Sequence, residues 1–148
     1  MPADAIEKPK KERVDGQVTG LSGELFVAAE LLKRGIQTSV TFGNAKSIDL
    51  LAYNQKTKAK FSIQVKSLRS INYFLIDPKK VETEHIYVFV LLGKEESPVR
   101  YFIVPGAILK LESERFGKPF NVPKMPGIHP KLLAQEGFEG NWAVFNAA

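Results

Sequence analysis

Three polar side chains interrupt two short apolar segments that follow one another in the chain. Asp49 lies within Ile48–Tyr53, and Gln64 and Lys66 lie within Phe61–Lys66. Both segments have the length and composition of β-strands. Because side chains alternate between the two faces of a strand, Gln64 and Lys66 share one face. An acid, an amide and a cation that converge in a partly desolvated place are what a metal-assisted hydrolytic site requires.

The loop between the two segments predicts how these side chains meet. A β-hairpin that turns after Tyr53 pairs this residue with Lys60, and the same register places Asp49 opposite Gln64. Lys66 follows one pair further along, on the same face. We therefore expect the acid, the amide and the cation to meet at one end of the hairpin.

Each of these residues also has an ordinary structural interpretation. Gln64 and Lys66 can belong to the solvated face of an amphipathic strand, since antiparallel sheets often have one wet face. Asp49 can be a turn or cap residue. However, apolar side chains occupy both faces of the strand around Asp49, which is typical of a central strand. A carboxylate in such a strand needs a partner.

A third acid precedes the two strands on a predicted helix. The segment Thr19–Arg34 has apolar residues at helical spacing, and Gly35 suits the left-handed position after a helix end. Glu24 lies about 60° from the centre of the apolar stripe, near enough to face the sheet. Its alternative role is to complement the helix dipole, worth some tenths of a kcal/mol. The residues expected to form the buried stripe are Leu21, Leu25, Ala28 and Leu32.

Glu24 on the helix, Asp49 on the first strand and Gln64-Val65-Lys66 on the second together resemble the PD-(D/E)XK nuclease superfamily. The resemblance covers under half of the chain, and two features depart from the family pattern. No proline precedes Asp49, and Gln64 stands where an acid is usual, although some branches that resemble restriction enzymes have Gln there. The resemblance implies a small stand-alone member with a three-layer α/β/α, restriction-endonuclease-like core and a mixed central sheet.

The resemblance also implies a function and a role for each residue. It implies a metal-dependent nuclease that hydrolyses phosphodiester bonds, in DNA in preference to RNA, with Mg²⁺ (or Mn²⁺) as cofactor. Asp49 would be the main metal ligand, with Glu24, the Gln64 amide oxygen and the Val65 backbone carbonyl as further oxygen ligands. Lys66 would lie beside the attacking water and offset charge on the phosphate. The implied catalytic residues are Glu24, Asp49, Gln64 and Lys66.

Gln64 keeps a second class of function open, because an amide brings no charge to a metal. The chain can be a catalytically inactive nucleic-acid-binding or complex-forming module that retains the nuclease fold. A third interpretation, a purely structural interaction domain, predicts neither DNA binding nor Mg²⁺ binding.

Positive charge is concentrated around the predicted hairpin. Between Asn54 and Lys80 there are seven Lys and Arg residues and one acid, Asp77, within a chain of net charge +5. A positive field around an acidic metal site suits a polyanionic substrate, whereas the ordinary alternative is a solubilising surface. The residues expected to contact nucleic acid are Lys56, Lys58, Lys60, Arg69, Lys79 and Lys80.

Length and composition set the remaining limits. A chain of 148 residues predicts one domain, which we expect to span residues 17–148 behind a flexible polar tail at 1–16. The absence of Cys excludes disulfides and thiolate metal sites. No apolar run reaches the length of a membrane span and no signal-peptide core is present, so we expect a cytoplasmic protein without a membrane partner. A homodimer or a protein partner stays open.

The rest of the sequence predicts the scaffold. The alternation of strand-like and helix-like segments favours a mixed sheet with helices on its faces. We expect strands at 71–76, 86–92 and 100–104, helices after Pro105 and at 130–136, a long loop at 117–130, and a last strand or anchor at 142–145.

Overall fold

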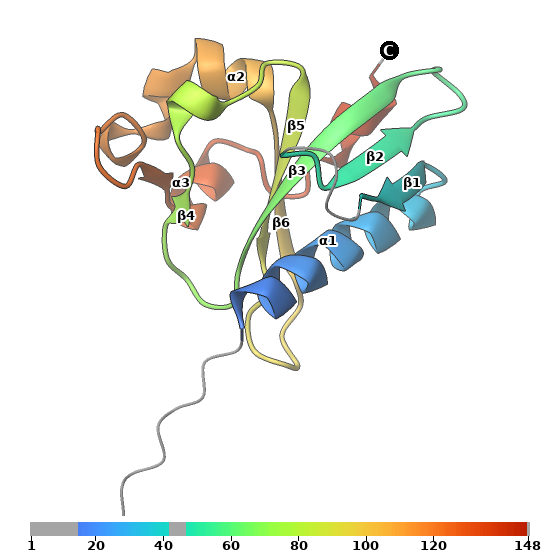
Figure 1. The fold of residues 1–148 in the computed structure, drawn as a ribbon, viewed down its shortest axis with the longest axis horizontal. Helices are drawn as coiled ribbons and strands as arrows, with labels where there is room; N and C mark the ends of the chain where they lie inside the picture. Colours follow the sequence, from blue (N-terminus) through green and yellow to red (C-terminus); the bar gives the residue numbers. More distant parts are fainter. Residues whose placement is uncertain (1–14, 42–46, 148) are drawn as a thin grey trace, which may run out of the picture.

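The computed structural model describes residues 15–41 and 47–147 and is built around a mixed five-stranded sheet with the strand order β1-β2-β3-β5-β6 (Figure 1). Strands β3 and β5 run parallel, and the other neighbours are antiparallel. The strands are β1 (Gln37–Val40), β2 (Leu50–Tyr53), β3 (Lys60–Leu68), β5 (His85–Leu91) and β6 (Arg100–Pro105).

Helices cover both faces of this sheet. Helix α1 (Gly16–Lys33) lies along one face, while α2 (Gly106–Leu111) and α3 (Pro130–Gln135) lie on the other side (Figure 1). The predicted fold class, an α/β core with a mixed central sheet between helical layers, is therefore confirmed. The remaining elements are the strands β4 (Phe74–Leu75) and β7 (Gly127–Ile128) and the 3-10 helices η1 (Pro78–Lys80), η2 (Ser113–Phe116), η3 (Lys118–Phe120) and η4 (Trp142–Asn146).

Strand β5 divides the interior into two apolar cores. Val88 and Val90 point into the core beneath α1, and Tyr87 and Phe89 point into the core beneath α2 and α3. Burying one such side chain contributes about 1.5–3 kcal/mol, so a strand buried on both faces fixes the position of its neighbours. The neighbour that matters for the site is β3, which pairs with β5 along its length from Ser62.

Helix α1 has clear ends, but its buried face differs from the predicted stripe. The Asp15 carboxylate accepts a hydrogen bond from the Gln17 N–H (2.8 Å), and Gly35 takes the left-handed conformation (φ 80°) after the last turn. Ala28 is buried as predicted. The other predicted stripe residues, Leu21, Leu25 and Leu32, are 43%, 49% and 55% exposed. The residues that α1 buries are Gly23, Val27, Ala28 and Leu31.

A glycine explains this rotation of α1. A Cβ atom at Gly23 would lie 1.8 Å from the Ser67 Oγ, so only glycine lets the helix approach β3 this closely. Hydrophobicity does not register this contact, because glycine adds no apolar side chain to the stripe. The rotation brings Glu24, the next residue, closer to the sheet than the stripe predicted.

Several smaller predictions also change. The strand expected at 71–76 is reduced to β4, which pairs with β7 inside the segment expected to be a loop. Strand β1 was not anticipated. The segment predicted as a strand or anchor is the 3-10 helix η4, which anchors Trp142 and Phe145 in the core beneath α1. The predicted tail falls almost entirely on residues 1–14, which lie outside the described residues. None of the helices within 15–41 and 47–147 is long and apolar enough to cross a membrane.

The contact at Gly23 leads to a prediction on stability. Gly23→Ala forces a methyl group against Ser67 and should lower the free energy of unfolding by about 1–3 kcal/mol. The matched control is Gly20→Ala, because Gly20 is on the same helix with no atom within 4 Å of its missing Cβ. That control should be neutral or stabilising by up to about 1 kcal/mol. Urea denaturation measures both, and equal effects would contradict the close contact.

Candidate active site

The hairpin of β2 and β3 has the register that the sequence predicted. Tyr53 pairs with Lys60, and Leu50 pairs with Ile63 at the last position of β2. Asp49 lies just beyond this last pair. The predicted pairing of Asp49 with Gln64 is not among the pairs of β2 and β3, because Asp49 also bonds to Ile63.

Asp49 sits at an irregularity of the sheet. Its N–H donates to the Ile63 carbonyl on β3 (2.9 Å), while its own carbonyl accepts from the Thr41 N–H next to β1 (3.0 Å). In a regular strand both groups of one residue would point to the same neighbour. Ile63 is already the partner of Leu50, so two residues of one strand face one residue of the other, as in a β-bulge. Such a bulge re-aims the Asp49 side chain.

The Asp49 carboxylate takes the place of a missing strand residue. Its Oδ2 accepts a hydrogen bond from the Val65 N–H at 2.8 Å. Because the N–H and C=O of a strand residue point to the same side, the Val65 carbonyl is directed to the same edge. Within the described part of the chain, β2 does not pair with β3 beyond Ile63. A carboxylate and a carbonyl oxygen thus lie together at an open strand edge.

Glu24 completes a pair of acids at this edge. Burial raises the pKa of Glu24 to about 7, and hydrogen bonding to Asp49 and repulsion from its charge act in the same direction. The two carboxylates are therefore close neighbours, brought together by the approach of α1 at Gly23. In the ranges that the structure describes, no group of three or more His, Cys, Asp or Glu residues is placed to hold a metal. A metal here would need amide or backbone oxygens besides the two acids.

Gln64 is buried and its amide is fixed by β5. Its Nε2 lies 3.0 Å from both the His85 Nδ1 and the Tyr87 hydroxyl oxygen. The Tyr87 oxygen also accepts from the Glu82 N–H at 2.9 Å. When Nε2 donates to the His85 Nδ1, that histidine is neutral and carries its proton on Nε2. Among the described residues no hydrogen bond reaches the Gln64 Oε1, which leaves this oxygen as a potential ligand atom.

Lys66 lies two residues further along the same face of β3. Gln64 and Lys66 line one cavity of about 330 Å³, together with Ser47 and Lys80. Ser47 is two residues before Asp49, but neither Glu24 nor Asp49 lines this cavity. Lys66 forms no salt bridge with either acid in the part of the chain that is described. The convergence of Glu24, Asp49 and Lys66 on one metal therefore stays a prediction.

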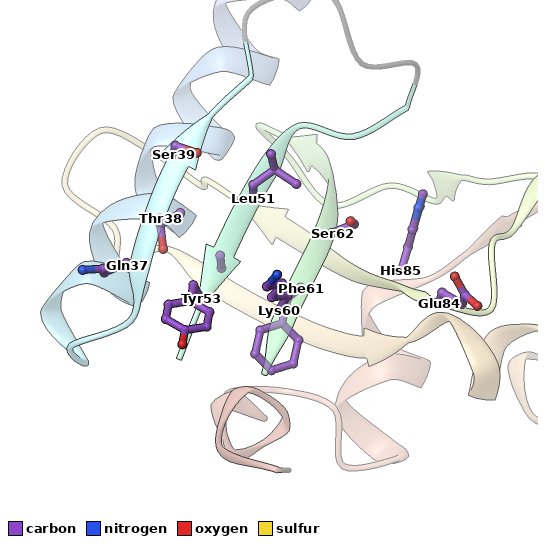
Figure 2. A pocket seen from close by; sticks show the side chains of 11 residues that line it. Gln37, Thr38, Ser39, Leu51, Tyr53, Lys60, Phe61, Ser62, Glu84 and His85 are labelled. Carbon is purple, nitrogen blue, oxygen red and sulfur yellow. The ribbon is translucent and has the colours of Figure 1, made fainter. Parts of the chain in front are cut away.

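The face of the sheet opposite α1 is open over β1 and β2 (Figure 2). A cavity of about 720 Å³ lies there, and Figure 2 shows Tyr53 beside Lys60 and Leu51 beside Ser62 along its floor. His85 belongs both to this cavity and to the contact that holds Gln64. Through His85 this cavity adjoins Gln64, while neither acid lines it.

The predicted basic residues are spread over three parts of the molecule. Lys56, Lys58 and Lys60 lie at the turn end of the hairpin, opposite to the end that carries the acids. The Arg69 Nε donates to the Thr19 hydroxyl (2.9 Å) where β3 ends. Lys79 and Lys80 lie on η1, and Lys80 shares a cavity with Lys66. A continuous basic rim around the site stays a prediction.

Sequence reasoning missed the two residues that position Gln64. His85 immediately precedes the strand predicted at 86–92, and Tyr87 lies within it, among apolar residues. Both act through the parallel pairing of β3 with β5, whose register places Gln64 beside Tyr87. A crossover of this kind leaves no local turn signal in the sequence, unlike the hairpin of β2 and β3.

This chain shows little similarity to known proteins. No protein-family model and no curated protein matches the chain. A similar solved structure is that of a bacterial homing endonuclease, I-Ssp6803I, with a TM-score of 0.47 and 16% identity over 66% of this chain and 74% of that chain. A similarity of this extent does not identify a function or the residues that carry it.

The shared environment of Glu24 and Asp49 predicts how stability depends on pH. Folded Glu24 holds its proton up to about pH 7, whereas the unfolded chain releases it near the ordinary value of 4.5. The wild type should therefore lose stability as pH rises between these two values. Glu24→Gln removes the titrating group, so its gain over the wild type should be smallest near the lower value and largest above about pH 7.

Thermal unfolding across this pH range, with a chelator present, measures the effect. Glu30→Gln is the matched control, because Glu30 is on the same helix and pairs with Arg34 at the surface. A difference between Glu24→Gln and wild type that does not vary with pH would contradict the pairing of Glu24 with Asp49.

Proposed function

We propose that this protein is a metal-dependent nuclease that hydrolyses phosphodiester bonds, in DNA in preference to RNA. The observation that carries the proposal is the Asp49 carboxylate, which Val65 holds at the open edge of β3 beside Glu24. Two neighbouring carboxylates repel each other, and a divalent cation between them would remove this repulsion.

The available donors fit Mg²⁺ or Mn²⁺. Mg²⁺ prefers oxygen ligands and usually keeps several waters. Asp49, Glu24, the Val65 carbonyl and the Gln64 Oε1 are all oxygen donors, and the first three meet at one strand edge. The bound cation would supply Lewis-acid chemistry and lower the pKa of a coordinated water.

The residues of the chain have separable roles in this proposal. Hydrolysis consumes one water: its oxygen bonds to phosphorus, the bond to the leaving sugar oxygen breaks, and that oxygen takes up a proton. Lys66 offsets the negative charge that develops on the phosphate. Glu24 would hold the cation directly or through a water. His85 and Tyr87 are positioning residues for the Gln64 amide.

One observation favours a second candidate, the inactive nucleic-acid-binding or complex-forming module. Gln64 is buried and already bound by two residues of β5, which is a sufficient structural reason for an amide at this position. In that case the site would bind nucleic acid or a partner without cleaving it.

Two substitutions separate the candidates. Asp49→Asn should abolish both Mg²⁺ binding and cleavage, because it removes the charge of the main ligand. Lys66→Ala should lower cleavage by at least about 100-fold and leave DNA binding nearly intact, since one lysine contributes little to a many-contact interface. Lys33→Ala is the matched lysine control, because Lys33 is exposed in the last turn of α1 and is not among the predicted contacts, and this variant should keep its activity.

Calorimetry with Mg²⁺ or Mn²⁺ and incubation with supercoiled, linear, branched and single-stranded DNA provide the measurements. A wild-type protein that binds DNA yet cuts none of these forms with either metal would establish the inactive module instead.

The positive charge predicts a strong dependence of DNA binding on salt. Each phosphate that a Lys or Arg neutralises releases counterions, so affinity should fall steeply as salt rises. Removing both Lys79 and Lys80 should lower the logarithmic salt slope by about 2 if both contact phosphates, and removing Lys56 and Lys58 tests the hairpin end in the same way. Fluorescence anisotropy at several salt concentrations measures the slope. An affinity independent of salt would refute these contacts.

A further inference from the structure

A second cavity adjoins Lys66 on the open edge of β3. It has a volume of about 770 Å³ and lies between residues 65–68 of β3, residues 72–75 and the segment that carries Val122 and Met125. Its volume is within the range of small-ligand sites, roughly 300–1,000 Å³. We call it the edge cavity.

Large apolar side chains around the edge cavity remain exposed to solvent. Tyr73, Leu75, Val122 and Met125 are 43%, 55%, 40% and 77% exposed, and all four line the cavity. An exposed apolar cluster around a cavity is a feature of ligand and interaction sites on folded proteins. The edge cavity therefore has the properties of a site for a largely apolar group.

Lys66 links this apolar site to the proposed reaction centre. Its side chain lines both the edge cavity and the cavity that contains Gln64. Val65, whose N–H binds Asp49, also lines the edge cavity. A molecule bound in the edge cavity would thus place its apolar part within one side-chain length of the Lys66 ammonium group. A nucleobase joined to its own phosphodiester has this combination of groups.

The polar groups of the edge cavity suit the rim of a base. The Asn72 Oδ1 accepts a hydrogen bond from the Tyr73 N–H (2.8 Å), which fixes the amide and leaves its Nδ2 able to donate to a carbonyl or ring nitrogen. The Tyr73 ring is held edge-on by His129, with ring centroids 5.1 Å apart. A fixed aromatic ring and an amide donor together can stack on a base and bond its edge.

A base in a continuous duplex cannot reach such a site, because it is stacked and paired inside the helix. We propose that the edge cavity holds an unpaired nucleotide beside the scissile phosphate. The enzyme therefore acts on single-stranded or locally unpaired DNA in preference to continuous duplex. This inference rests on the proposed function, to which it adds the class of substrate.

Binding without cleavage tests the edge cavity separately from catalysis. The wild-type protein, in a chelator, is titrated with a single strand, a duplex with one unpaired nucleotide and a continuous duplex, each labelled for anisotropy. We expect the first two to bind more tightly than the third. A 2-aminopurine at the unpaired position should lose fluorescence on binding, as its ring stacks on Tyr73.

Three variants make the test specific. Tyr73→Ala should weaken binding of the unpaired substrates between about 5-fold and about 100-fold and leave the duplex unchanged, because stacking on one aromatic side chain is lost. Tyr73→Phe should retain the wild-type affinity, since it keeps the ring. Leu111→Ala removes an even more exposed apolar side chain (75% against 43% for Tyr73) from α2, outside the edge cavity, and should change nothing. If Tyr73→Ala fails to fold, Val122→Ser at the exposed rim replaces it and should show the same selective loss.

The outcomes distinguish this inference from the proposed function. Selective binding of unpaired DNA without any cleavage in Mg²⁺ or Mn²⁺ would support the edge cavity and overturn the nuclease. Cleavage of continuous duplex as readily as of single strands, unchanged by Tyr73→Ala, would overturn the edge cavity and leave the nuclease standing. Failure to bind any DNA would overturn both, and binding of a protein at these apolar residues would then account for their exposure.

Discussion

The hydrogen bond between the Asp49 carboxylate and the Val65 N–H is the interaction on which the site depends. It ends the pairing of β2 with β3 by putting a side chain where the next strand residue would lie. The edge of β3 beyond this point stays open, and its carbonyl oxygens are directed away from β5. Both cavities that share Lys66 lie along this unpaired portion of β3. If β2 paired with β3 beyond this point, it would cover the open edge and close the site.

The packing of β5 and of α1 against the sheet offsets the cost of placing the two acids together. Burial raises the pKa of Glu24 to about 7, and hydrogen bonding to Asp49 and repulsion from its charge add to this cost of the charged form. The fold accepts this cost because β5 is buried on both faces and Gly23 sets α1 tightly against β3. A helix with a larger residue at Gly23 would stand further from the sheet, and Glu24 would lose its contact with Asp49. The pair of acids is therefore a product of backbone proximity as much as of charge.

The sequence predicted the parts of the site that local patterns determine. Alternation along two strands joined by a short turn was enough to pair Tyr53 with Lys60, but not to foresee the bulge that sets Asp49 against Ile63. Glu24 was predicted to lie near the sheet, although the apolar face predicted for α1 was wrong. Glycine has no side chain to add to a hydrophobic pattern, so such a pattern could not predict the Gly23 contact that orients α1. The parallel pairing of β3 with β5, which supplies His85 and Tyr87, has no local signal either.

The residues around Gln64 explain why an amide suits this position. A carboxylate in its place would be a third negative charge near Glu24 and Asp49, and would raise the pKa of Glu24 further. The amide is neutral, and its Nε2 lies 3.0 Å from the His85 Nδ1 and donates to the Tyr87 oxygen, which an ionised carboxylate cannot do. Glutamine thus gives up charge that would attract a cation, but it adds no third negative charge to the pair of acids. Its amide oxygen can still serve as a neutral ligand, so an amide at this position is compatible with an active site that binds its metal weakly.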